Sequence, residues 1–351
     1  MLFHPLRWLK RRIAPAQTTP AGPDLQGLLN GYRSTALIYA AAKLKLPDAL
    51  AAGPRTSAEL AQNLNVHAPS LHRLLRGLVA LGLCTEEAGG SFRLTPPGAR
   101  LQSTNGRSEY SLAILNGEEY ARAWNDLLHS IRTGETAFDH AFGQSPWEHR
   151  RTTPGLNACF NTWLKNGAAD AGGSLLNAHD FSAYRCIADL GGGNGTLLGA
   201  LLQAHPAARG ILFDQPHVVA TARPLLEAGG VAARCELVEG SFFERIPAGA
   251  DVYILKSILH DWDDEKSLTI LRHCHATLKT GQPLLVLEKI LPELAATAPT
   301  MIMNDLHMLA VTGGLERTAE AYEKLFRRAG FRLKQIIPLR TGHSLLETVR
   351  A

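Results

Sequence analysis

The chain has 351 residues, of which 45% are hydrophobic and 19% are charged, and its formal net charge is +4. This composition excludes a disordered, collagen-like or coiled-coil chain as the main architecture. The length predicts two domains, and so small a charge argues against nucleic-acid binding.

Residues 1–23 form a basic N-terminal arm that begins MLFHPLRWLKRR and ends in a proline-containing linker. Charged and proline residues interrupt its apolar part, so we expect a frayed or partner-docked terminus rather than a secretion signal. A membrane-touching amphipathic arm is the alternative. Elsewhere the longest apolar stretches have the length of strands, so the sequence predicts no membrane span.

The five cysteines are far apart and form no C-x-x-C pair. A disulfide framework and a thiolate zinc site are therefore not expected. Buried free thiols fit a protein of the reducing cytoplasm, which is the location we predict.

Residues 24–105 are predicted to form a compact, mostly helical domain. Ser57–Leu64 and Ser70–Leu83 carry apolar residues at helical spacing, and the turn at Ala88–Gly90 predicts a small hairpin between Leu83 and Leu94. Two helices followed by a hairpin indicate a winged helix. Because the second helix is largely apolar, packing or dimerisation is favoured over DNA binding.

Residues 106–177 look helical and carry several aromatic side chains, including Trp124, Phe160 and Trp163. Most of these are expected in the core. Because this segment precedes the domain with the chemistry, some of them are expected to line a pocket for a flat substrate.

From Arg185 onward, short apolar strands alternate with helices, which predicts a doubly wound α/β sheet. The last two strands are joined by a tight turn and should form an antiparallel hairpin. The expected strands are Cys186–Leu190, Gly210–Phe213, Cys235–Val238, Val252–Leu255, Pro283–Leu287, Phe331–Ile337 and Ser344–Val349. The expected helices are Thr196–Ala204, His217–Glu227, Glu265–Lys279 and Ala319–Ala329.

A glycine-rich loop, DLGGGNGT, follows the first of these strands from Asp189. A dinucleotide site would have G-x-G-x-x-G, but Thr196 takes the place of the third glycine. The tighter spacing suits a ligand without a pyrophosphate, such as S-adenosylmethionine. Asp214 ends the second strand, where an acidic group can accept hydrogen bonds from ribose hydroxyls. Together these signals predict an adenosine cofactor, with NAD as the alternative.

The third strand runs into Glu239-Gly240-Ser241-Phe242-Phe243. In a nucleoside-binding sheet this edge faces the adenine, so Phe242 could cover the ring and Ser241 could hydrogen-bond its edge. The alternative is that both phenylalanines belong to the core and the serine to a turn. For Phe243 the two interpretations are equally supported, and for Phe242 the adenine contact is favoured.

His260 lies just after the fourth strand, where α/β folds place their chemistry, and is the candidate general base. Glu288 and Glu316 could orient it, because a carboxylate beside a histidine fixes its tautomer and raises its basicity. The run Arg272–His275 lies in a predicted helix with its side chains pointing apart, so we do not expect a metal there.

Six segments in order resemble the caffeate and hydroxyindole type of S-adenosylmethionine-dependent O-methyltransferase. The resemblance covers about Leu25 to Val349. The segments are DLGGGNG at Asp189, FDQPHV at Phe213, LKSILHDWDDE at Leu255, LEKILPE at Leu287, NDLHML at Asn304 and GGLERT at Gly313.

This resemblance implies a Rossmann-like class I methyltransferase domain over 106–351, preceded by a winged-helix dimerisation domain, and a homodimer. We expect no metal. It implies catalytic roles for His260, Glu288 and Glu316. It implies acceptor contacts from Met301, Asp305 and Met308, and we expect Trp163 of the aromatic helical segment in the same pocket. It implies cofactor contacts from Gly191, Asp214, Ser241, Phe242 and Lys256. From the same loop and strand ends we also expect cofactor contacts from Asp189, Gly193, Gln215, Gly240 and Trp262. Ser241 departs from the family, which usually has aspartate there, so a weaker adenine contact is expected.

We therefore expect methyl transfer from S-adenosylmethionine to a hydroxyl of an aromatic or polycyclic small molecule of secondary metabolism, with His260 as general base. Three alternatives remain: a nicotinamide oxidoreductase, a winged-helix regulator that senses a metabolite, and a repurposed family member that no longer methylates. Retention of His260, Glu288 and Glu316 argues against the last.

Overall fold

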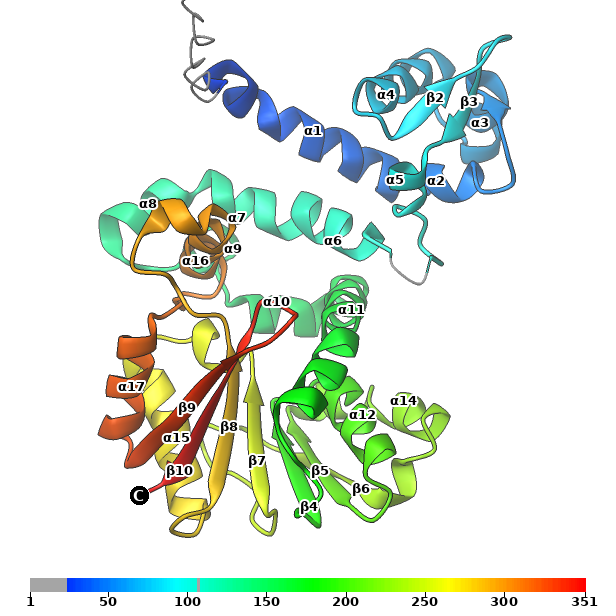
Figure 1. Cartoon of the computed structure of the whole chain (residues 1–351). Helices are drawn as coiled ribbons and strands as arrows, with labels where there is room; N and C mark the ends of the chain where they lie inside the picture. The colour runs from blue at the N-terminus through cyan, green and yellow to red at the C-terminus, as the bar shows by residue number, and fades with distance from the viewer. Residues whose placement is uncertain (1–23, 106–107) are drawn as a thin grey trace, which may run out of the picture.

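The computed structural model describes residues 24–105 and 108–351, with the side chains of 166–170 left out, and the predicted N-terminal arm lies outside the described residues. An N-terminal helical module, a layer of helices and a large sheet domain follow one another in space (Figure 1). Within the described ranges, no helix is both long and apolar enough to cross a membrane.

The N-terminal module contains the predicted winged helix. The helix α3 begins in a capping box, in which the hydroxyl of Thr56 and the carboxylate of Glu59 each accept a backbone N–H from the other residue. The small antiparallel sheet has the order β1-β3-β2. The elements are α1 (Leu25–Lys43), α2 (Leu46–Ala49), β1 (Arg55–Thr56), α3 (Ser57–Leu64), α4 (Ala68–Ala80), β2 (Cys84–Glu86), β3 (Ser91–Leu94) and α5 (Pro96–Ala99).

The helical layer confirms the helical prediction for the middle of the chain. It is completed from a distance by α16 (Pro299–Val311), whose Ala310 and Val311 pack into the same apolar cluster as Phe138 and Leu115. The other elements are α6 (Tyr110–Leu115), the π-helix η1 (Asn116–Tyr120), α7 (Ala121–Asn125), α8 (Leu127–Thr133), α9 (Ala137–Phe142), α10 (Pro146–Thr152) and α11 (Pro154–Ala178).

The large sheet has seven strands in the order β6-β5-β4-β7-β8-β10-β9. β10 pairs antiparallel with both β8 and β9, and the other strand pairs are parallel, so the predicted doubly wound sheet with a terminal hairpin is confirmed. The strands are β4 (Cys186–Leu190), β5 (Arg209–Asp214), β6 (Cys235–Glu239), β7 (Val252–Lys256), β8 (Pro283–Glu288), β9 (Phe331–Pro338) and β10 (Ser344–Arg350).

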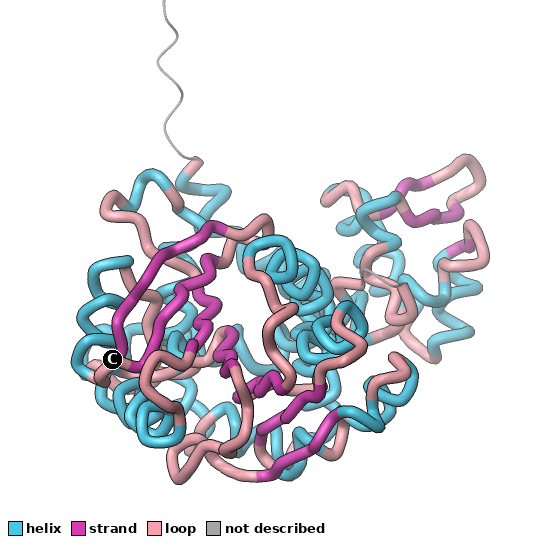
Figure 2. Tube along the Cα trace, turned by 60° about the horizontal axis from the view of Figure 1, so that its bottom comes forward, coloured by secondary structure: helices cyan, strands magenta, loops and turns pink. Residues whose placement is uncertain are grey.

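Helices cover both faces of this sheet, which Figure 2 shows as one twisted row of strands. Each face buries its own apolar cluster, so the central strands are buried on both sides. The helices are α12 (Thr196–Ala204), α13 (Pro216–Val219), α14 (Arg223–Ala228), α15 (Asp264–Thr277) and α17 (Ala319–Arg328), with short 3-10 turns η2 (Ala232–Arg234), η3 (Leu259–Asp261) and η4 (Ala295–Thr297).

The structure differs from the sequence prediction in the bounds of several elements. The single helix expected over His217–Glu227 is two short helices, α13 and α14. Pro224 explains the break, because its ring would clash with the carbonyl four residues earlier and it has no N–H to donate. In addition, β5, β6, β7 and β8 each end one residue later than predicted, on a polar residue. The last strand position thus holds a predicted site residue in three of them: Asp214, Lys256 and Glu288.

Candidate functional site

The glycine loop lies between the end of β4 and the start of α12. Gly191 and Gly193 have φ of 68° and 60°, in the left-handed region that favours glycine. A Cβ on Gly191 would lie 2.4 Å from Cδ1 of Ile258, whereas a Cβ on Gly193 would meet no atom within 4 Å. One glycine therefore allows a close approach inside the protein, and the other faces open space.

Asp214, at the end of β5, fixes the shape of this loop. Its carboxylate accepts the N–H of Gly193 at 2.8 Å and the N–H of Gln215 at 2.7 Å. Burial raises the pKa of Asp214, and these two backbone hydrogen bonds oppose that rise. A carboxylate oxygen can accept more than one hydrogen bond, so Asp214 can still receive ligand hydroxyls.

Asp189, near the end of β4, and Lys256, at the end of β7, are close enough to interact electrostatically. Asp189 is 1% exposed, and its Oδ2 has no hydrogen-bond partner among the described residues. Burial raises the pKa of Asp189 to about 7, with the nearby Lys256 acting in the opposite direction. Burial likewise lowers the pKa of Lys256. A buried carboxylate with a free oxygen can accept a donor from a ligand in the loop.

Aromatic side chains gather at the neighbouring strand ends. The ring of Phe243 lies edge-on to that of Trp262 at 4.8 Å, and Phe242 lies 6.2 Å from Trp262. The Cβ position of Gly191 is 3.5 Å from Phe242, so this ring lies beside the glycine loop. Ser241 accepts the N–H of Phe243 at 3.2 Å and keeps its own hydroxyl proton to donate. The predicted adenine edge is therefore apolar, with one hydroxyl.

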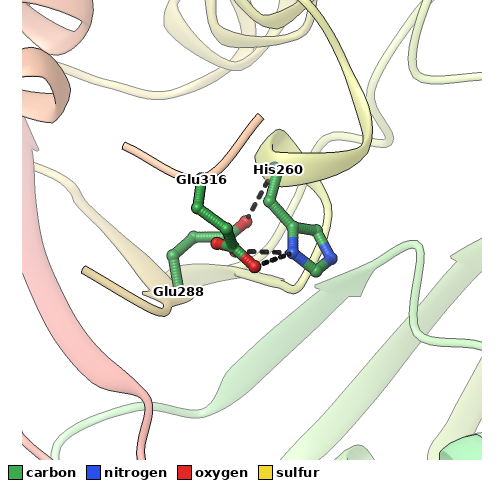
Figure 3. Close-up of side chains that lie close together, drawn as sticks. All are labelled: His260, Glu288 and Glu316. Atoms are coloured by element: carbon green, nitrogen blue, oxygen red, sulfur yellow. Dashed lines mark hydrogen bonds and ion pairs between the residues drawn. The ribbon is translucent and has the colours of Figure 1, made fainter. Parts of the chain in front are cut away.

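The predicted catalytic trio meets in space from three separate segments. His260 lies on the 3-10 turn η3, Glu288 ends β8, and Glu316 lies in the loop between α16 and α17. Nδ1 of His260 is 3.1 Å from Oε1 of Glu316 and 3.9 Å from Oε2 of Glu288. Both carboxylates lie on one side of the imidazole, and Nε2 lies on the other (Figure 3).

Glu288 also holds the turn that carries the histidine. Its Oε1 accepts the backbone N–H groups of Ile258 at 3.0 Å, Leu259 at 2.8 Å and His260 at 3.4 Å. The side chain of Glu288 is fully buried, so these bonds compensate part of the cost of burying its charge. Glu288 is thus a capping group for η3 as well as a neighbour of the imidazole.

Glu316 is held by two neighbouring residues of α16. The amide of Asn304 donates to its Oε1, and its backbone N–H donates to Oδ1 of Asp305 at 2.8 Å. Asp305, predicted near the acceptor, therefore uses one oxygen to hold the Glu316 loop. Asn304 lies in the NDLHML segment but was not predicted as a site residue, because its contact with Glu316 depends on the packing of α16.

The electrostatics of the cluster favour a positively charged histidine in the empty protein. Burial lowers the pKa of His260, but the carboxylates of Glu288, Asp261 and Glu316 outweigh burial and raise it to about 9. Burial raises the pKa of Glu288, and it raises that of Asp261 to about 6. Nδ1–H faces the carboxylates as a donor, so Nε2 is the atom that can exchange a proton with a ligand.

The same trio could also bind a cation. One ligand atom from each of His260, Glu288 and Glu316 lies within 4.8 Å of the others. Their carboxylates, however, already accept hydrogen bonds from three backbone N–H groups and from Asn304. The absence of a metal remains a prediction that a chelator can test.

The residues predicted to contact the acceptor lie on two helices. Trp163 of α11 is 37% exposed, with its ring 6.0 Å from Phe160. On α16, Met308 is buried and Met301 is partly buried. Their role in contacting an acceptor stays a prediction.

Sequence reasoning missed a polar pair in the helical layer. Trp124 donates its indole N–H to Nδ1 of His307 at 3.0 Å, and Tyr120 packs edge-on against the same imidazole at 4.6 Å. Burial lowers the pKa of His307 to about 4, so it is neutral with its proton on Nε2. Only its spacing could have pointed to His307 as a site residue, because it lies one helical turn after Asn304 on α16.

Two family models match the chain. The O-methyltransferase domain matches residues 124–332, and the O-methyltransferase dimerisation domain matches residues 26–104. The first spans more than half of the chain and includes the glycine loop, His260, Glu288 and Glu316.

Similar proteins come from bacterial biosynthesis. The chain is 40% identical over 333 residues to phenazine O-methyltransferase PhzM of Lysobacter antibioticus, covering 95% of this chain and 97% of that protein. It is 38% identical to O-demethylpuromycin-O-methyltransferase of Streptomyces alboniger, covering 91% and 87%. A solved O-methyltransferase from neocarzinostatin biosynthesis, in complex with S-adenosylmethionine and 2-hydroxy-5-methyl naphthoic acid, is 34% identical with a TM-score of 0.82, covering 91% of this chain and 96% of that one.

Proposed function

The chain belongs to the S-adenosylmethionine-dependent O-methyltransferases that act on small molecules, and from this membership we propose that it methylates a hydroxyl of an aromatic or polycyclic acceptor, with His260 as general base. The observation that carries the proposal is the His260 cluster: Glu316 holds Nδ1 at 3.1 Å, which leaves Nε2 for the acceptor proton. The similar proteins' names support an aromatic acceptor of secondary metabolism.

The cofactor residues fit an adenosyl group on three counts. Gly193 faces open space, Asp214 has lone pairs left for ribose hydroxyls, and Phe242 offers an apolar face for adenine. Asp189 and Lys256 add charged groups near the ends of β4 and β7. Bound there, S-adenosylmethionine supplies an electrophilic methyl group on a positively charged sulfur.

The chemistry assigned to this chain is a proton transfer. Nε2 of His260 accepts the proton of the acceptor hydroxyl as the oxygen becomes nucleophilic, and the carboxylates of Glu316 and Glu288 stabilise the resulting imidazolium. Base catalysis of this kind contributes about 10²–10⁴-fold, and positioning of the acceptor contributes further.

The experiment combines binding and turnover. We would titrate the protein by calorimetry with S-adenosylmethionine, S-adenosylhomocysteine and NADH. We would then measure methyl transfer to a panel of aromatic acceptors that includes 1,4-dihydroxy-2-naphthoic acid, which is bound in a solved O-methyltransferase from neocarzinostatin biosynthesis. We expect binding of both adenosyl ligands without NADH, and turnover that survives EDTA. NADH binding would favour the oxidoreductase, loss of turnover in EDTA would favour a metal, and adenosyl binding without any turnover would favour a repurposed enzyme.

A substitution then tests the base. His260→Ala should retain affinity for S-adenosylhomocysteine and lose about 10²-fold or more in kcat. Thr152→Ala, on the exposed surface of α10, is the control for the preparation and should behave as wild type. Full turnover in His260→Ala would remove the histidine from the mechanism.

We also propose that the enzyme is a cytoplasmic homodimer. Leu25, Leu28, Leu29 and Tyr32 recur at helical spacing on α1, and each is about two-thirds exposed, from 67% to 69%. The matched dimerisation family covers this helix from residue 26. All five cysteines are free thiols, which suits a reducing compartment.

A further inference from the structure

Arg317 contacts the turn that carries the candidate base. It is 2% exposed, and its guanidinium donates from Nη1 to the carbonyl of Leu259 at 2.9 Å and from Nη2 to the carbonyl of Trp262 at 2.9 Å. These two carbonyls flank His260, one residue before it and two residues after it. The guanidinium therefore spans the whole turn rather than one end of it.

The other end of the guanidinium is anchored on α15. Nε donates to Oδ1 of Asp264 at 3.0 Å, and Nη2 donates to Oγ of Ser267 at 3.2 Å. Asp264 is 55% exposed, so the buried cation has a carboxylate partner that remains in contact with water. The planar guanidinium has enough donors to reach two carbonyls, a carboxylate and a hydroxyl at once. A lysine ammonium has three donors on one atom and cannot reach all four.

The backbone of Arg317 ties the remaining two members of the cluster together. It follows Glu316 directly in the chain. It also pairs with Ile290 in an isolated parallel bridge, and its carbonyl accepts the N–H of Leu291 at 3.0 Å. Ile290 and Leu291 lie two and three residues after Glu288, so the bridge joins the Glu316 loop to the end of β8.

We propose that Arg317 is a positioning residue for catalysis, which locks the segments of His260, Glu288 and Glu316 into one frame. The inference rests on the proposed role of His260 as general base. The contact between Nδ1 and Glu316 spans 3.1 Å, and a hydrogen bond weakens steeply when its geometry is lost. A residue that fixes both sides of this contact sets the direction in which Nε2 points.

The first test measures His260 directly. In histidine-labelled protein, with the resonance assigned through His260→Ala, the pKa of His260 is followed by NMR in wild type and in Arg317→Lys. Lysine keeps the positive charge but cannot make the hydrogen bonds of the guanidinium to the turn. The turn should therefore shift, and the imidazole should move away from Glu316 and Glu288. We expect the pKa to fall toward the ordinary histidine value by about one unit or more. An unshifted pKa would overturn the proposal.

The second test separates positioning from folding. In Arg317→Lys we expect kcat with 1,4-dihydroxy-2-naphthoic acid, or with the best acceptor of the panel, to fall about 10²-fold. Affinity for S-adenosylhomocysteine should change less than about threefold, and the acidic limb of the kcat profile should move to lower pH. If kcat and the affinity for S-adenosylhomocysteine fell by the same factor and the acidic limb did not move, Arg317 would have a merely structural role and the proposal would be overturned.

Two further variants serve as control and safeguard. Arg328→Gln removes an exposed arginine that donates to Glu265 of the same helix α15 at 2.9 Å, and it should leave every readout unchanged. If Arg317→Lys does not fold, Asp264→Asn weakens the anchor from the exposed side and should shift the same readouts less. A wild type without turnover would defeat the proposed function, while the NMR titration would still decide the role of Arg317.

Discussion

At the scale of single residues, His260 is defined by the charges around it. Two buried carboxylates face Nδ1, and Asp261 lies 3.8 Å from Nε2. Together they raise its pKa to about 9, which favours the protonated imidazole in the empty protein at neutral pH. The proposed role as general base therefore requires the pKa of His260 to fall when the site fills.

A positively charged sulfonium would cause that fall, because a like charge nearby lowers the pKa of a histidine. We predict that S-adenosylmethionine lowers the pKa of His260 by about one to two units, and that S-adenosylhomocysteine, whose sulfur is neutral, lowers it far less. NMR titration of His260 in the two complexes measures the difference. Equal pKa values in both complexes would show that the charge of the cofactor does not tune the base.

At the scale of elements, the backbone of the turn η3 lies in close contact with the loop before α17. A Cβ on Gly314 would lie 2.0 Å from the carbonyl oxygen of His260 and 2.4 Å from the carbonyl carbon of Asp261. Both are backbone atoms and cannot rotate away. The glycine therefore permits the approach that brings Glu316 to the imidazole.

We predict that Gly314→Ala pushes the loop from the turn, lowers kcat by about tenfold or more, and destabilises the protein by about 1–3 kcal/mol, as overpacking does. Thermal unfolding and initial rates check both effects. Gly173→Ala is the matched control: this glycine lies exposed in α11, a Cβ there meets nothing within 4 Å, and alanine favours the helix. An active, stable Gly314→Ala would contradict the close contact.

At the scale of the whole molecule, the exposed stripe of α1 is the feature that the single chain leaves unexplained. Contiguous apolar side chains of this kind mark an interaction surface. We predict that Leu28→Asp together with Leu29→Asp converts a dimer of about twice 38.0 kDa into a monomer, as light scattering after size-exclusion chromatography would show. Leu294→Asp alters an equally exposed leucine, at 69%, and should leave the dimer intact. A wild type that runs as a monomer would refute the assignment.

The sequence by itself determined the order of elements and the family, and it predicted which side chains form the site. Buried strands show as short apolar runs because both faces of a parallel sheet are covered. The glycine loop, Asp214 and His260 follow strand ends, and parallel strands bring such ends to one edge. The trio of His260, Glu288 and Glu316 could be named because its motifs are local in the chain.

Only the tertiary structure decided which atoms meet. That Asn304 and Asp305 hold Glu316, that Glu288 caps η3, and that Arg317 spans the turn are contacts between segments far apart in sequence. The neutral state of His307 likewise depends on burial beneath Trp124. Local patterns cannot report such contacts, because hydrogen-bond distances and desolvation are fixed by packing between elements and not by spacing along the chain.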